Sequence, residues 1–183
     1  GDYAGAGSPL ITITGNGTLT VSEGVDPEKI KMVVVPEGET VTGVTISAEQ
    51  TLRKFGPGTL VLDAANEYSG GTEVCGGTIE VQDKDALGTG VVTVYGFGDR
   101  SGRLVFNLPT EATIANDLVF ETASSLDYPA LHFANKTVLS GAVHAKADLY
   151  LSTAWGDDPA AASQENVRFT GAVTVDPVGA ASG

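Results

Sequence analysis

The chain has 183 residues, of which 23 are acidic and 10 are basic, and its formal net charge is -13. This charge argues against nucleic acid as a partner, because binding a phosphate backbone requires clustered cations. The longest apolar runs, such as Met32 to Val35, are far too short to span a bilayer, so we expect no membrane insertion by this segment. A composition that is 42% hydrophobic and 18% charged is typical of a folded chain.

Short runs of β-type residues, separated by turn residues, follow one another from Leu10 onward. Such runs predict strands, and no stretch has the spacing of three and four that predicts a helix. We expect loops around 96–102 and 153–165. The predicted strands are 11–14, 18–21, 31–35, 40–46, 59–62, 72–74, 78–81, 91–95, 103–107, 118–121, 130–133, 137–139, 148–151 and 167–175.

Strand-sized units recur imperfectly along this all-β chain. The pattern G-x-G-T-L-x-apolar occurs at 15–21 and 56–62, and returns one residue shorter at 76–81. A second pattern, apolar-hydroxyl-G-A-V, occurs at 139–143 and 169–173. Recurring single-strand units favour a β-solenoid, in which each unit buries its apolar face only by stacking on its neighbour. A β-sandwich is the alternative.

The most strongly patterned stretch reads LRKFGPGTLVLDAANEYSGGTEVCGGTIEV from Leu52, and an ALGTG turn follows at 86–90. From Leu52 to Val94 the chain closely resembles the autotransporter-associated β-strand repeat, also called the passenger-associated transport repeat. It departs from the family pattern at Ile79, where the family usually has Leu. The residues that match the pattern are Gly56, Gly58, Asn66, Tyr68, Gly70, Gly71, Gly76, Gly77, Gly88 and Gly90.

This resemblance implies a right-handed, single-stranded parallel β-helix from a bacterial secreted or surface-displayed protein. It implies a non-enzymatic, adhesin-like passenger or stalk, whose partner would be a host or matrix protein or a glycan. In related Gram-negative proteins a C-terminal membrane barrel anchors the passenger, so we expect an anchoring domain elsewhere in the parent chain. The alternatives are a carbohydrate-binding or polysaccharide-active β-helix fragment, and a pure structural spacer.

We expect one β-helix domain over residues 10–175, with its consensus repeat at 52–94. Residues 1–9 are expected to be a flexible segment or a tag remnant, and residues 176–183 a flexible tail.

Residues of the repeat that could be mistaken for a site have structural explanations. The glycine pairs lack the Lys, the Ser/Thr and the following helix of a phosphate-binding loop, so we expect them to supply positive φ at corners. Asn66 is expected in a turn, and Tyr68 is expected to cap the core with its hydroxyl in water. Cys75 has no nearby base in the sequence, so we do not expect a nucleophile.

No residue is predicted to be catalytic, to bind a cofactor or to ligate a metal. His132 and His144 lack the spacing of a metal site and are expected at the surface. The paired acids lie in turn-like stretches, where solvated carboxylates are common; they are Asp26 with Glu28, Asp83 with Asp85, and Asp157 with Asp158.

Trp155, Asp157 and Asp158 form the most suggestive local group. An indole ring stacked on a sugar face, with carboxylates accepting from its hydroxyls, would make a glycan contact. The alternative is that Trp155 fills the core or the open end of the solenoid.

Overall fold

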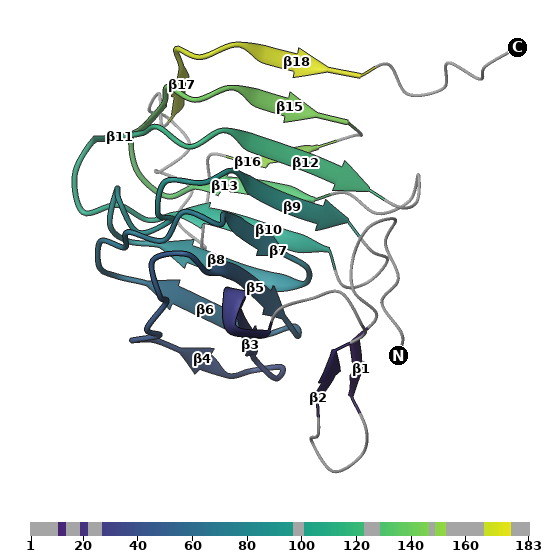
Figure 1. The fold of residues 1–183 in the computed structure, drawn as a ribbon. Helices are drawn as coiled ribbons and strands as arrows, with labels where there is room; N and C mark the ends of the chain where they lie inside the picture. Colours follow the sequence, from purple (N-terminus) through teal and green to yellow (C-terminus); the bar gives the residue numbers. More distant parts are fainter. Residues whose placement is uncertain are drawn as a thin grey trace, which may run out of the picture.

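The computed structural model describes residues 11–13, 19–21, 27–96, 101–122, 129–146, 149–152 and 167–176. Most of them form a parallel β-helix, whose coils stack along one axis from β3 at the bottom of Figure 1 to β18 at the top. The predicted all-β solenoid is confirmed, and the sandwich alternative is wrong, because the stacked strands pair in parallel.

Three sheets make the faces of the solenoid. The first sheet holds β3 (Ile30–Val34), β5 (Thr51–Phe55), β7 (Thr72–Val74), β9 (Val92–Gly96), β12 (Leu118–Thr122), β15 (Val143–Ala145) and β18 (Val173–Val175). The second holds β4 (Thr40–Val41), β6 (Thr59–Leu62), β8 (Gly77–Val81), β10 (Gly102–Phe106), β13 (Ala130–Phe133) and β16 (Tyr150–Ser152). The third holds β11 (Ala112–Ile114), β14 (Thr137–Leu139) and β17 (Val167–Phe169).

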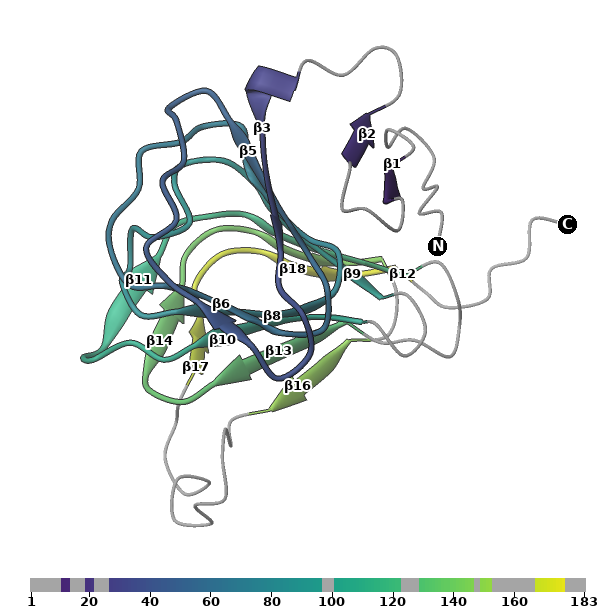
Figure 2. The ribbon, with the colours of Figure 1, turned by 90° about the horizontal axis from the view of Figure 1, so that it is seen from below.

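The coil is right-handed. Figure 2 looks along the axis from the end where β3 and β4 lie. Each coil runs clockwise from the first sheet to the second, and back to the first sheet past the side where the third sheet lies, while it recedes from the viewer. A clockwise path that recedes is a right-handed helix, as the repeat resemblance implied.

Identical positions of successive coils stack into ladders that fill the core. In the second sheet the inward ladder runs through Leu60, Ile79, Leu104 and Leu131, which are all fully buried. Phe106 and Phe133 stack in the next ladder, with ring centroids 5.7 Å apart. Each such side chain contributes about 1.5 to 3 kcal/mol to stability on burial. The inward side chains of the last described strands are exposed; they are Leu151, Val173 and Val175.

Most predicted strands are present, with three omissions and one division. The sequence patterns missed β5, β11 and β15, and the predicted strand 167–175 is divided into β17 and β18. Strands β1 (Ile11–Ile13) and β2 (Leu19–Val21) pair antiparallel with each other, outside the three parallel sheets. A 3-10 turn at Pro27–Lys29 precedes β3.

Several predictions fall beyond the described parts of the chain. The terminal segment 1–9 and the expected loop at 153–165 lie outside the described residues, as does nearly all of the tail at 176–183. The domain limits at 10 and 175 therefore stay predictions. Within the described ranges, no helix is long and apolar enough to cross a membrane.

Candidate functional site

The corners of the repeat coil require glycine for two different reasons. Gly56, between β5 and β6, has a φ of 80°, in the region that favours glycine. Gly58 has no positive φ, but a Cβ there would lie 2.1 Å from the carbonyl oxygen of Pro36 in the preceding coil. Positive φ thus explains only part of the glycine pattern, and the close approach of neighbouring coils explains the rest.

Asn66 connects two coils through its side-chain amide. Its Nδ2 donates to the carbonyl of Ala64 at 3.1 Å, within its own turn, and to that of Ala86 at 2.8 Å, in the next coil. Asn116 does the same at a later turn, where its Nδ2 donates to the carbonyls of Gly88 and Gly90. Both amides satisfy backbone acceptors, and this makes them structural rather than available to a ligand.

Tyr68 is fully buried, so the expectation of a solvated hydroxyl is wrong. The hydroxyl lies 2.5 Å from Oγ1 of Thr72, which is also buried, so the pair satisfies its hydrogen bonds inside the solenoid. Burial raises the pKa of Tyr68 to about 12, although the hydrogen bond with Thr72 opposes the rise. A tyrosine hydroxyl can replace water with an internal partner, and the sequence did not show that Thr72 supplies one.

Cys75 follows β7 on the outward-facing side of the chain. In β7 the side chain of Val74 is buried and that of Glu73 is half-buried, and Cys75 continues this alternation with a half-buried thiol. Burial raises its pKa to about 12; Glu73 adds to the rise, whereas Arg53 and Lys54 oppose it. A thiol of this kind stays protonated at neutral pH and is a poor nucleophile.

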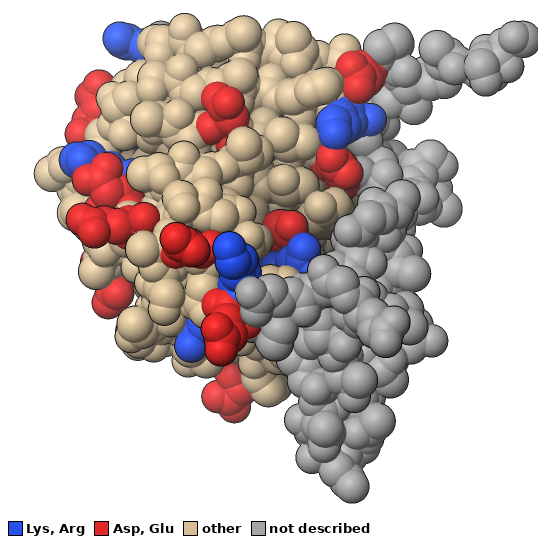
Figure 3. All heavy atoms as spheres, viewed as in Figure 1, with Lys and Arg blue, Asp and Glu red and all other residues tan. Residues whose placement is uncertain are grey.

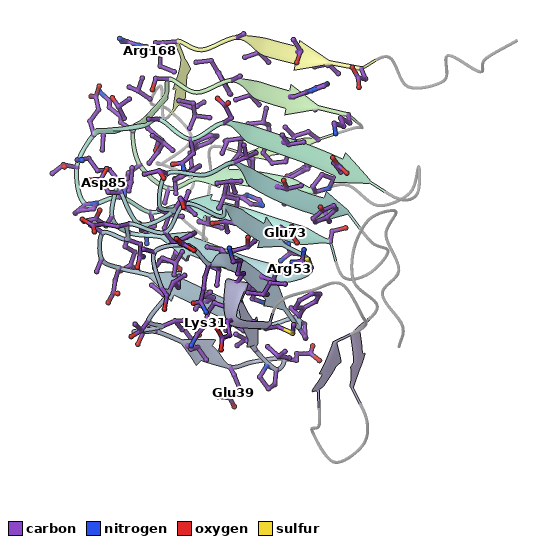
Figure 4. All side chains as sticks on the ribbon, in the orientation of Figure 1. Lys31, Glu39, Arg53, Glu73, Asp85 and Arg168 are labelled. Atoms are coloured by element: carbon purple, nitrogen blue, oxygen red, sulfur yellow. The ribbon has the colours of Figure 1, made fainter. Side chains whose placement is uncertain are left out.

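Arg53 and Glu73 form an ion pair across β5 and β7 on the outer face of the first sheet (Figure 4). Arg53 Nε lies 2.7 Å from Oε2 of Glu73, and Nη2 donates to Oε1 at 3.2 Å. The two side chains are only 13% and 23% exposed, so water screens the pair less than it screens a fully exposed one. This two-point contact joins consecutive coils from outside.

Both histidines were expected at the surface, and the structure places only His144 there. His144 lies at the surface, with its side chain 38% exposed and its Nε2 3.2 Å from Oδ1 of Asp176. His132 is 9% exposed, so the prediction of a surface group is wrong. Its ring packs against Tyr150 at a centroid distance of 5.7 Å, and burial followed by the charge of Arg103 lowers its pKa.

The described acidic pairs hold local structure. Oδ1 of Asp83 accepts from the backbone N–H of Asp85 at 2.8 Å, and Asp85 pairs with Lys84. Glu28 is exposed, whereas its predicted partner Asp26 lies outside the described residues. In the parts of the chain that the structure describes, no three His, Cys, Asp or Glu side chains are placed to hold a metal ion.

A shallow polar hollow of about 210 Å³ lies beside Asp85. Its lining combines Lys84 and Asp85 with the hydroxyls of Thr89 and Thr113. In Figure 3 acidic side chains gather along the left edge of the molecule, where Figure 4 labels Asp85, while uncharged side chains cover much of the face formed by the first sheet. The predicted glycan contacts Trp155, Asp157 and Asp158 lie outside the described residues.

Lys54 is a residue of the site region that sequence reasoning did not single out. It belongs to β5, is fully buried, and directs its ammonium at backbone carbonyls of two coils. The signal was present in the sequence as a lysine at an alternating position between Leu52 and the corner glycines.

The fold defines a class of protein, a parallel β-helix, and one of its coils carries a repeat that a family model matches. Residues 52–81 match the model of the passenger-associated-transport-repeat family, and the chain therefore contains one such repeat. The chain is also 34% identical over 99 residues to the adhesin BmaC autotransporter of Brucella suis biovar 1 (strain 1330). That alignment covers 49% of this chain and 3% of the relative, and no solved structure matches. These similarities indicate a bacterial extracellular or cell-surface location.

Proposed function

We propose that this chain is a non-enzymatic, adhesin-like segment of a bacterial passenger, which presents the outer faces of its β-helix to a host or matrix partner. The observation that supports the proposal is the passenger repeat at 52–81, together with the similarity to an autotransporter adhesin. The polar groups of the repeat support it as well, because Asn66, Tyr68 and Arg53 are all occupied by contacts within or between coils. A coil of this kind is a scaffold, and recognition then belongs to its surface.

Within this function, we propose Trp155, Asp157 and Asp158 as a glycan contact. The support is from sequence: the one tryptophan of the chain lies next to two acids. The polar hollow beside Asp85 is an alternative sugar site within the described residues. Its lining offers the hydroxyls of Thr89 and Thr113 and the Lys84–Asp85 ion pair.

A binding screen against matrix proteins and an array of glycans tests both proposals. We expect saturable binding by the wild-type chain, and a loss of glycan binding in Trp155→Ala. A variant of the hollow, Thr113→Val, is the matched control, and loss in that variant alone would move the glycan site to Asp85. Uniformly negative results contradict the adhesin proposal and favour a spacer.

A polysaccharide-degrading activity is the remaining alternative and needs its own assay. Incubation with acidic and neutral polysaccharides, followed by detection of new reducing ends or unsaturated sugars, distinguishes it from binding. Turnover that survives repurification of the chain would contradict the non-enzymatic proposal.

A further inference from the structure

Lys54 occupies a position where an aliphatic side chain is expected. It pairs in register with Val33 of the preceding coil and with Val74 of the following coil, both of which are buried. Lys54 itself has no exposed surface. Its hydrocarbon stem therefore lies in an inward ladder of valines, and its ammonium must find partners inside the molecule.

Those partners are three backbone carbonyls. Nζ of Lys54 donates to the carbonyl oxygen of Phe55 at 3.2 Å, of Gly56 at 2.5 Å and of Gly76 at 2.9 Å. The ammonium has three N–H donors, and all three are used. Two acceptors belong to the corner between β5 and β6, and the third belongs to the equivalent corner of the next coil, between β7 and β8.

The surrounding backbone is fitted to this ammonium. At Gly77, next to the third acceptor, a Cβ would lie 2.6 Å from Nζ of Lys54 and 2.3 Å from the carbonyl oxygen of Gly56. Gly77 also has a φ of 63°, which other residues rarely adopt. Both the lysine and the glycine of the following coil are therefore required for this contact.

Burying the ammonium of Lys54 in the core costs free energy. Burial lowers the pKa of Lys54 to about 8, although the nearby Cys75 opposes the change, so the group is still charged at neutral pH. A lowered pKa means that the folded chain disfavours the charge relative to the unfolded chain. Stability alone thus does not account for Lys54, and an apolar side chain of similar volume would avoid this cost.

The contact between Lys54 and Gly76 can specify the register between neighbouring coils. A shift of two residues between neighbouring strands keeps inward side chains inward, so ladders of Val, Leu and Ile restrict such shifts only weakly. A buried ammonium that loses an acceptor pays a large desolvation penalty. We propose that Lys54 fixes the register between the coil of β5 and β6 and the coil of β7 and β8, because only one alignment places the Gly76 carbonyl at its ammonium.

The substitution Lys54→Met tests this proposal, because it retains the stem and removes all three donors. We expect a variant with wild-type far-ultraviolet circular dichroism but with two sets of amide resonances for residues 72–81, which report two strand alignments. Lys31→Met is the matched control: Lys31 lies on β3, pairs in register with Leu52 and is half-buried. The control should keep a single set of resonances. A single set with wild-type contacts between β5 and β7 in Lys54→Met overturns the proposal.

A measurement on the wild-type chain tests the hydrogen bond between Lys54 and the Gly76 carbonyl, on which the proposal depends, even if Lys54→Met does not fold. In a chain with ¹⁵N-labelled lysine and ¹³C-labelled glycine, the Lys54 ammonium should exchange slowly with water and show a coupling through its hydrogen bond to the Gly76 carbonyl. The ammonium of Lys31 gives the reference exchange rate. A Lys54 ammonium that exchanges as fast as that of Lys31, without the coupling, overturns the proposal.

Discussion

The hydroxyl of Tyr68 lies 2.5 Å from Oγ1 of Thr72 inside the solenoid, and neither side chain has more than 1% of its surface exposed. Tyr68 lies in the irregular segment between β6 and β7, and Thr72 is the first residue of β7. The contact therefore connects this corner to the first sheet. Both residues belong to the passenger repeat at 52–81.

Tyr68→Phe should lower the free energy of unfolding by about 1 kcal/mol, because it leaves the Thr72 hydroxyl buried without this partner. Urea denaturation measures the change. Tyr150→Phe is the matched control, because Tyr150 is 58% exposed and should tolerate the loss of its hydroxyl. Equal effects of the two substitutions would contradict an internal hydrogen bond at Tyr68.

Gly141→Ala should destabilise the chain by about 3 kcal/mol, because the added methyl group overlaps backbone that cannot move away cheaply. A Cβ at Gly141 would lie 2.1 Å from the carbonyl oxygen of Asn116 in the preceding coil. Gly38→Ala separates this clash from backbone strain, since Gly38 has a φ of 77° with nothing within 4 Å of a Cβ. Thermal unfolding should show the larger loss for Gly141→Ala; the reverse order would contradict the close stacking of coils.

Alkylation of Cys75 by iodoacetamide at about pH 8 should be about a thousand-fold slower in the folded chain than in urea. The reason is that burial raises the thiol pKa from 9.0 to about 12, which removes nearly all of the thiolate. Mass spectrometry of the modified chain gives both rates. Similar rates in the two conditions would place the thiol in water.

The buried ammonium predicts how stability depends on pH. Between about pH 8 and pH 10.5 the unfolded chain binds more protons at Lys54 than the folded chain, so the free energy of unfolding rises with pH for this group. Cys75 and Tyr68 have raised pKa values and act in the opposite direction. The contribution of Tyr68 is common to the wild type and to Lys54→Met; that of Cys75, whose pKa Lys54 lowers, is removed by placing Cys75→Ser in both chains.

The difference in unfolding free energy, wild type minus Lys54→Met, should therefore increase by about 2 kcal/mol between roughly pH 7.5 and pH 10. Urea denaturation at each pH gives this difference. A difference that stays constant would mean that the pKa of Lys54 is not lowered by folding.

The sequence predicted most of the strands, and the missed strand β5 is one in which a polar side chain points inward. The strands at 59–62, 72–74 and 130–133 were expected and are present as β6, β7 and β13. The strand β5 was missed because Arg53 and Lys54 interrupt its apolar alternation, whereas in the structure Lys54 lies in the core and Arg53 forms an ion pair outside it.

The candidate site, too, was predicted only in part from the sequence. The pattern of glycines predicted tight corners, and Gly56 has the expected positive φ. The burial of Tyr68 and His132 could not be predicted. Thr72 lies only four residues after Tyr68, but the sequence does not show that both side chains point inward. His132 contacts Tyr150 only because β13 and β16 stack. Coil-to-coil contacts join residues that are distant along the chain, and local sequence patterns do not specify them.

The most direct test of the proposed adhesive function is a binding isotherm of the folded, fluorescently labelled chain on host epithelial cells, with unlabelled chain as competitor. Chain unfolded in urea and diluted immediately before the measurement provides the control. We expect saturable binding that unlabelled folded chain displaces and that the unfolded control lacks. Binding that does not saturate, or that is equal for the folded and unfolded chains, would contradict the adhesin-like function.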